Sequence, residues 1–283
     1  SNSIALDEEG GIYVVSAKQM YRVQWTGAEL TLDEGKGGWQ SAYETGDGIS
    51  SAGRLGAGSG STPSLMGSGD MDKFVVITDG QELAHIVLFW RDEIPTDWQP
   101  IAEGKSRRIA AEIPITYGNS TRTISMSEQS VLVRGYGAAV VSNDYRNIEL
   151  LSGLSTGNAI LDTIRNGIVV FFSNLQLIQP YGVEKFEWDP VNRSLGTAWV
   201  NDDISCPNGI PTMSATSQLM YCVGARSIAW TIEGINWNTG ESKFHKRIGI
   251  LPKFNSFYAA TQLGNKGAII SGTSRGVMEL APN

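Results

Sequence analysis

Short apolar runs alternate with glycine-rich or polar turns along the whole chain. The clearest series has three apolar runs, a tight turn and a fourth run: Ile210–Met213, Leu219–Val223, Ile228–Ile235, the turn Asn236–Gly240, and Glu241–Ile248. The runs are rich in strand-forming residues, and none has the length and period of a helix. The series therefore predicts a four-stranded antiparallel meander, which is the blade of a β-propeller.

The same order of runs and turns recurs, with further copies that begin near Asn2, Thr62, Thr123 and Asn255. Repeats of about 40–50 residues predict a propeller or a solenoid, and the missing helical period argues against helical solenoids. We therefore expect an all-β propeller with six blades, and with five as the alternative. The choice depends on residues 119–189, which hold either two irregular blades or one blade with an insertion.

No linker and no shift in composition divides the chain, so we expect a single β-propeller domain over residues 1–283. An irregular insertion is expected around residues 143–180, with a strand at 168–179. The glycine- and serine-rich stretch 46–61 predicts a loop on one face. It lacks the P-loop pattern, so a phosphate-binding role is not expected there.

The net charge of −7 argues against a nucleic-acid partner and against an anionic membrane surface. No apolar run is long enough to cross a bilayer, so membrane insertion is not expected. No signal peptide begins the chain, but the chain opens directly on a strand, which indicates a processed amino terminus. We expect an extracellular or periplasmic location and leave a cytoplasmic one open.

The two cysteines, Cys206 and Cys222, flank the predicted hairpin 211–218 and are nearly symmetric about Ser214. One interpretation is a disulfide between adjacent strands of an exported protein. The other is two buried thiols that act as small apolar residues. Both stay open at this point, because sequence does not fix the register between strands to one residue.

Two steps of the chain resemble the senescence-marker/gluconolactonase and strictosidine-synthase-like propellers. One is Pro207–Ile210 followed by Leu219–Val223, and the other is Asn2–Asp7 followed by Gly10–Val14. In the gluconolactonase branch, the asparagine of the P-N-G step binds a central divalent cation, usually calcium, so the resemblance implies that role for Asn208. The chain departs from the family at its amino terminus, where the acidic ligand has no clear match.

Asn2, Asn208 and Asn255 occupy the same place in three repeats, at the start of the strand that borders a propeller's channel. Three amide oxygens there, with a carboxylate from Asp203 at the channel mouth, would suit Ca²⁺. The alternative is that these asparagines supply a turn conformation that other residues resist. Asp144, in the polar turn 143–147, is a further loop candidate.

Two functions follow. The preferred one is a non-catalytic propeller that binds a small molecule or a protein on its loop-rich face. The alternative is a calcium-dependent lactonase or esterase, in which Ca²⁺ polarises the carbonyl and a carboxylate activates water. The chain has only His85 and His245 and no G-x-S-x-G, HExxH or CxxC motif, which favours the first function and leaves enzymatic activity open.

Overall fold

The structure is a computed structural model that describes residues 2–46, 56–147 and 159–281. These residues form five antiparallel sheets, numbered I to V in chain order, and an α-helix, α1 (Ala159–Phe171). Sheet I contains β1 (Ala5–Leu6), β2 (Gly11–Val15), β3 (Gln19–Trp25), β4 (Leu30–Thr31) and β5 (Trp39–Ala42), and sheet II contains β6 (Ser64–Met66), β7 (Phe74–Thr78), β8 (His85–Trp90) and β9 (Ile109–Pro114). Sheet III contains β10 (Leu132–Arg134), β11 (Gly137–Val141), β12 (Val183–Asp189) and β13 (Ser194–Asn201). Sheet IV contains β14 (Thr212–Ser214), β15 (Leu219–Arg226), β16 (Ala229–Asn236) and β17 (Ser242–Gly249), and sheet V contains β18 (Thr261–Leu263), β19 (Ile269–Thr273) and β20 (Gly276–Leu280).

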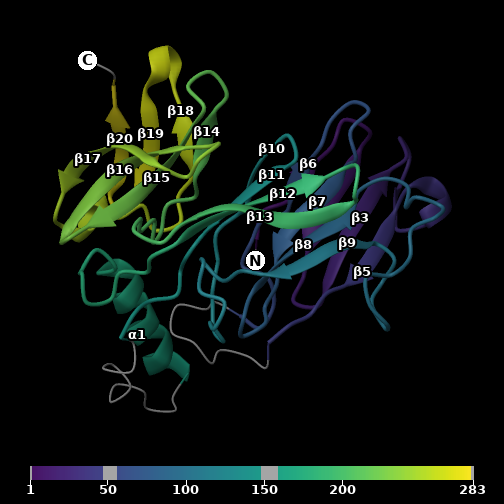
Figure 1. Cartoon of the computed structure of the whole chain (residues 1–283), viewed down its shortest axis with the longest axis horizontal. Helices are drawn as coiled ribbons and strands as arrows, with labels where there is room; N and C mark the ends of the chain where they lie inside the picture. Colours follow the sequence, from purple (N-terminus) through teal and green to yellow (C-terminus); the bar gives the residue numbers. More distant parts are fainter. Residues whose placement is uncertain (1, 47–55, 148–158, 282–283) are drawn as a thin grey trace.

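Consecutive strands pair with each other in sheets II to V, as in the blades of a propeller. In sheet I, β3 pairs with β4 along part of its length and with β5 along the rest. The five sheets form a row in chain order, because each packs against the next through a shared core, and sheet I (purple) and sheet V (yellow) lie on opposite sides of the molecule (Figure 1). The turns 7–10 and 67–73 and the connection 91–108 lie at one edge of the sheets, which we call the turn face, and the connections from one sheet to the next lie at the other edge, the loop face.

Apolar side chains fill the space between each pair of neighbouring sheets. On β7, Phe74 and Val76 belong to the core shared with sheet III, while Val75 and Ile77 belong to the core shared with sheet I. The alternation follows from the strand period of two, which sends successive side chains to opposite faces. Sheets II, III and IV are therefore buried on both faces, which explains why their central strands are continuous apolar runs in the sequence.

The all-β prediction and the four-stranded antiparallel blade are confirmed, and the described residues form five sheets, the number given as the alternative to six. Six blades required two sheets from residues 119–189. That stretch instead supplies three strands of sheet III, with the helix between β11 and β12.

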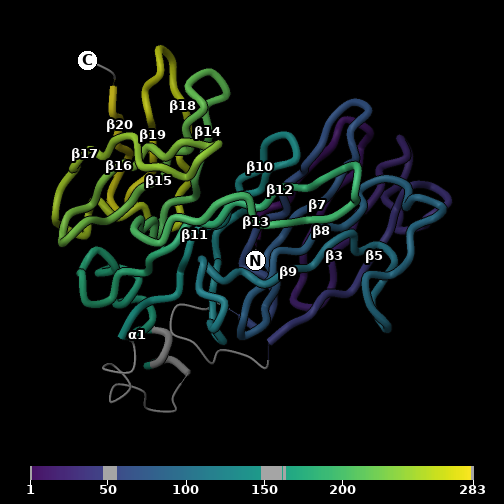
Figure 2. The backbone as a smooth tube through the Cα atoms, viewed as in Figure 1, coloured from purple at the N-terminus to yellow at the C-terminus, as the bar shows by residue number. Residues whose placement is uncertain are grey.

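The strand expected at 168–179 is wrong, because residues up to Phe171 belong to α1 and the following residues form turns. Val169 and Val170 on the helix are buried beside Met126, Tyr145 and Ile178, so packing rather than β-propensity decides the local structure. In Figure 2 the path between β11 and β12 leads away from the row of sheets to α1. The rest of the expected insertion, and of the expected glycine-rich loop, includes 148–158 and 47–55, which lie outside the described residues. Where the chain is described, none of its helices has the length and apolar character needed to cross a membrane.

Candidate binding site

A cleft of about 930 Å³ opens on the turn face between sheets I and II, and we call it the turn-face cleft. Its lining comes from turns of both sheets and from the strand ends beneath them. The residues that matter for its chemistry are Glu9, Arg22, Glu34, Trp39, Asp70, Asp72, Lys73, Trp90, Asp92, Glu93 and Arg108. Sheets I and II share a core that includes Trp39, and the cleft lies beside this residue, among the turns of the two sheets.

A buried ion pair forms one wall of the turn-face cleft. Arg22 on β3 donates to Asp7 Oδ2 at 3.1 Å and to the carbonyl of Gly37 at 2.6 Å, and Tyr13 donates to the same carboxylate at 2.6 Å. Burial raises the pKa of Asp7. The hydrogen bonds from Tyr13 and from backbone N–H groups lower it by more, so the pKa stays below its ordinary value. The wall therefore keeps its charges in place at neutral pH.

Arg108 forms the opposite wall. Its guanidinium lies over the ring of Trp39, 4.9 Å from the centroid, and donates to the carbonyls of Trp90 and Asp92. Burial lowers the pKa of Arg108 from its ordinary value, although an arginine remains charged at neutral pH. The stacking and the two carbonyls hold this cation in one orientation.

Two buried donors in the lining have no hydrogen-bond partner among the described residues: Nε of Arg22 and Nε1 of Trp90. A buried donor without a partner is costly, so such atoms are commonly satisfied by a water or a ligand. We call these two buried donors the floor of the cleft and the exposed carboxylates Glu34, Asp70 and Glu93 its rim, and the lining as a whole carries more acidic than basic side chains. The arrangement suits an occupant that offers hydrogen-bond acceptors to the floor and positive charge to the rim.

A smaller pocket of about 540 Å³ lies on the loop face and holds two of the sequence candidates, Asp144 and Asp203. Arg122 pairs with Asp144 at 2.7 Å and lies over the ring of Tyr117. Its remaining charged members are Arg146 and Asp202. Acidic and basic groups are therefore present together in this pocket, and Asp203 is exposed at its rim.

The structure brings Asn208 and Asn255 together, and both are fully buried. Asn208 Nδ2 donates to Asn255 Oδ1 at 2.9 Å, to Ser173 Oγ at 2.7 Å and to the carbonyl of Val170 at 2.8 Å. Asn255 Nδ2 donates to the same carbonyl at 2.8 Å. These bonds satisfy carbonyls at the end of α1 that have no partner within the helix.

The oxygen of each of these two amides also has a hydrogen-bond partner. Asn208 Oδ1 accepts from Tyr145 Oη at 2.8 Å, and Asn255 Oδ1 accepts from the backbone N–H of Phe257 at 2.8 Å. Asn2 is engaged elsewhere, because its Nδ2 donates to the carbonyls of Ser59 and Ser61. In this geometry the side chains of the three asparagines form hydrogen bonds between segments that are distant in the sequence, a role that neither interpretation of the sequence included, and calcium binding stays a prediction.

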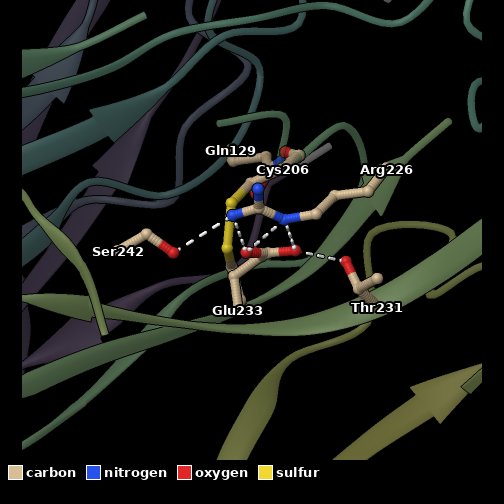
Figure 3. The surroundings of a disulfide bond; sticks show 7 residues. Gln129, Cys206, Arg226, Thr231, Glu233 and Ser242 are labelled. Carbon is tan, nitrogen blue, oxygen red and sulfur yellow. Dashed lines mark hydrogen bonds and ion pairs between the residues drawn. A yellow bond between two sulfur atoms is a disulfide. The ribbon is translucent and has the colours of Figure 1, made fainter. Parts of the chain in front are cut away.

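Cys206 and Cys222 form a disulfide, which confirms the predicted bond between these residues. Beside it, Arg226 and Glu233 form an ion pair through two nitrogens, and Thr231 and Ser242 bond to its ends (Figure 3). Glu233 lies directly opposite Cys222 across the β15–β16 pair. The disulfide joins the connection between sheets III and IV to β15, and Gln129, in the connection before sheet III, donates to the carbonyl of Cys206 at 3.0 Å (Figure 3).

The sequence offered no sign of one further cluster, formed by Asp79, His85 and Glu112, whose ligand atoms lie within 4.8 Å of one another. Lys105 Nζ already pairs with both oxygens of Glu112 at 2.9 Å, and Asp79 pairs with His85 at 3.2 Å. Within the cluster, the ammonium group of Lys105 therefore supplies positive charge to Glu112. The turn-face cleft was also missed, because its residues come from separate turns and share no local pattern.

No protein-family model matches the chain. Its sequence is 50% identical over 283 residues to an uncharacterized protein of Archaeoglobus fulgidus, and the match covers 99% of this chain and 51% of the relative. The chain therefore spans about half the length of this curated relative.

Among solved structures, the chain is similar to BamB from Moraxella catarrhalis, with a TM-score of 0.50 and 10% identity over 99% of this chain and 60% of that chain. It is equally similar to a protein from Lactobacillus plantarum, with a TM-score of 0.50 and 8% identity over 99% of this chain and 66% of that one. At these identities the likenesses show the fold alone, which is a β-propeller. The fold implied by the resemblance in the sequence is confirmed, and its particular superfamily stays a prediction.

Proposed function

We propose that the chain is a non-catalytic part of an exported propeller that binds a positively charged segment of a partner protein in the turn-face cleft. The observation that carries the proposal is the pair of unpartnered donors, Arg22 Nε and Trp90 Nε1, in residues of a lining that also carries exposed carboxylates. Backbone carbonyls of a bound segment would accept from the floor, and its lysine or arginine side chains would face the rim. The buried disulfide supports an exported location, because such bonds persist in oxidising compartments.

This proposal moves the binding site from the loop-rich face, which the sequence favoured, to the turn face. The loop-face pocket is smaller and carries Arg122 and Arg146 beside its carboxylates, so it offers less net charge to a partner. The turn-face cleft has six acidic residues against Arg22, Lys73 and Arg108. Complementary charge of this kind steers association and favours a basic partner.

The test is fluorescence anisotropy with a labelled deca-lysine peptide, and with deca-glutamate as the opposite charge. A triple variant, Glu34→Gln, Asp70→Asn and Glu93→Gln, should weaken deca-lysine binding about tenfold, since exposed charge pairs contribute about 0.2–1 kcal/mol each. The matched control changes three exposed glutamates outside the cleft lining, in the variant Glu82→Gln, Glu103→Gln and Glu279→Gln. An equal loss of deca-lysine affinity in the two triple variants would show that net charge alone explains the binding, and would contradict the proposal.

The variant Trp90→Phe distinguishes the contribution of the floor to peptide binding from that of the rim. The substitution keeps an aromatic ring beside Phe74 and Trp188 and removes the unpartnered N–H together with part of the buried indole. We expect weaker peptide binding with a similar salt dependence, because the charges at the rim are unchanged. Unchanged affinity would show that the floor takes no part in binding.

The alternative, a calcium-dependent hydrolase of the gluconolactonase type, has less support from the geometry. It requires a cation on Asn208, whose Oδ1 already accepts from Tyr145 and whose Nδ2 is committed to the end of α1. Asp203, the proposed carboxylate, lines the loop-face pocket, and Tyr145, which lines the same pocket, donates to Asn208 Oδ1. A bound cation would require these hydrogen bonds to rearrange.

A further inference from the structure

Sheet I has two apolar faces, and the described residues cover only one of them. Tyr13, Met20 and Trp39 pack against sheet II. The opposite face, which we call the outer face of sheet I, carries Leu6, Ile12, Val14, Tyr21, Val23 and Trp25. They share a face because the register places Leu6 opposite Ile12, Ile12 opposite Val23, and Val14 opposite Tyr21.

The outer face of sheet I is apolar without being part of any core. Leu6 is 64% exposed and Trp25 is 47% exposed, and none of the six side chains belongs to or packs against the hydrophobic clusters of the described residues. An antiparallel sheet with one face in water normally alternates apolar and polar residues. Sheet I instead has the pattern of sheets II to IV, whose two faces are both buried, and a contiguous exposed apolar patch of this kind marks a docking surface.

We propose that the outer face of sheet I is the seat of another propeller blade, supplied by a longer form of the same polypeptide. The row of sheets is not closed by the described residues, since sheets I and V lie at opposite ends of it (Figure 1). The Archaeoglobus fulgidus relative is about twice as long as the matched region, so its remaining residues are numerous enough to form further blades. The five sheets also correspond to only 60% of the similar BamB chain.

A second copy of this chain is the other candidate to cover the outer face. Two rows of five sheets would give a ring of ten blades, whereas propellers typically have about four to eight. Among the described residues, sheet V has three strands, so β20 has an edge without a described partner that a strand from the same polypeptide can complete. Both features favour blades from one chain over a ring of two copies.

The test compares side-chain exposure in the 283-residue chain and in the full-length Archaeoglobus fulgidus protein, by photolabelling with a diazirine and mass spectrometry. Labelling of Leu6 and Trp25 should exceed that of the aligned positions in the relative about fivefold, since a buried side chain keeps less than about a tenth of its surface exposed. Val191, 88% exposed in a turn, should be labelled to the same extent as its aligned position. Equal labelling of the outer face in both proteins would overturn the proposal.

A paired substitution gives a second readout. Val23→Glu should lower the Tm of the 283-residue chain by less than about 2 °C, because the charge enters a face open to water. The same change at the aligned position of the relative should lower its Tm by more than about 5 °C, because an unpaired charge would be buried between two blades. Val191→Glu is the matched control and should be mild in both proteins.

Sedimentation of the 283-residue chain over a range of concentrations tests whether a second copy of the chain, rather than a further blade, covers the outer face. The proposal expects a monomer, or self-association that Val23→Glu leaves unchanged. A dimer that Val23→Glu dissociates, with labelling of Trp25 that falls as concentration rises, would show that a second copy covers the face and would overturn the proposal. The peptide assay for the turn-face cleft does not involve this face, so either proposal can fail alone.

Discussion

Reduction of the Cys206–Cys222 disulfide should destabilise the protein substantially while leaving its fold intact. The two residues are 16 positions apart, and both sulfurs are buried in the core between sheets III and IV, beside Met220 and Ile235. In the chain-entropy account, a bridge across a loop of this length restricts the unfolded chain by about 3 kcal/mol. Two thiols occupy nearly the volume of the bridge, so reduction opens little cavity and the entropic contribution dominates the loss.

The assay is thermal unfolding followed by far-UV circular dichroism, with and without a phosphine reductant. A loss of about 3 kcal/mol corresponds to a fall in Tm of about 5–10 °C for a chain of this size. The control is the double variant Cys206→Ala and Cys222→Ala, whose Tm should not respond to the reductant. Thiol titration in denaturant should find no free thiol before reduction and two after it. A change in Tm below about 1 °C in the wild type, or two free thiols without reduction, would refute the reasoning.

Three further predictions follow from buried polar groups. Burial lowers the pKa of His85, but its hydrogen bond and charge interaction with Asp79 raise it above the ordinary 6.5. The pair therefore stabilises the fold fully at pH values below the unfolded pKa, and this stabilisation is lost as the pH rises through the pKa of the folded state. In urea unfolding, His85→Gln should lower the free energy of unfolding more at about pH 5.5 than at about pH 8.5. Asn208→Ala should lower the free energy of unfolding by about 2–4 kcal/mol, because it leaves Tyr145 Oη without its partner and weakens the hold on α1; a loss below 1 kcal/mol in urea unfolding would contradict this account. Added Ca²⁺ or chelator should leave the wild-type Tm unchanged, because the oxygens of Asn208 and Asn255 are already bonded, and a rise in Tm with Ca²⁺ would instead favour the hydrolase.

Sheet IV shows how far the sequence could predict the fold. The expected strands at 219–223 and 228–235 correspond to β15 and β16, and the expected turn at 236–240 joins β16 to β17. Prediction succeeds here because each run is buried on both faces and each break contains glycine or a polar turn residue. The disulfide could be predicted only as an alternative, since a shift of one residue would have turned Cys222 to the opposite face.

The helix and the turn-face cleft could not be found in the same way. The run Ile168–Phe171 is rich in β-branched residues, and it is helical because Val169 and Val170 are buried in a small core beside the propeller. The cleft brings Arg22 from β3 against Arg108, which precedes β9, through contacts between sheets that no local pattern encodes. In both cases tertiary packing decides the outcome, and local propensity does not.

The asparagines that begin the repeats recur along the sequence, but the recurrence alone did not show what their side chains contact. Asn2 donates to the carbonyls of Ser59 and Ser61, Asn208 to that of Val170, and Asn255 to those of Val170 and Phe171. Each joins the start of a sheet to a segment far away in the sequence, which is the task that the repeated position shares. A carboxylate at this position would have no donor for these carbonyls, whereas an amide both donates and accepts. Recurrence of asparagine, rather than of aspartate, therefore favours hydrogen-bonding joints over cation ligands.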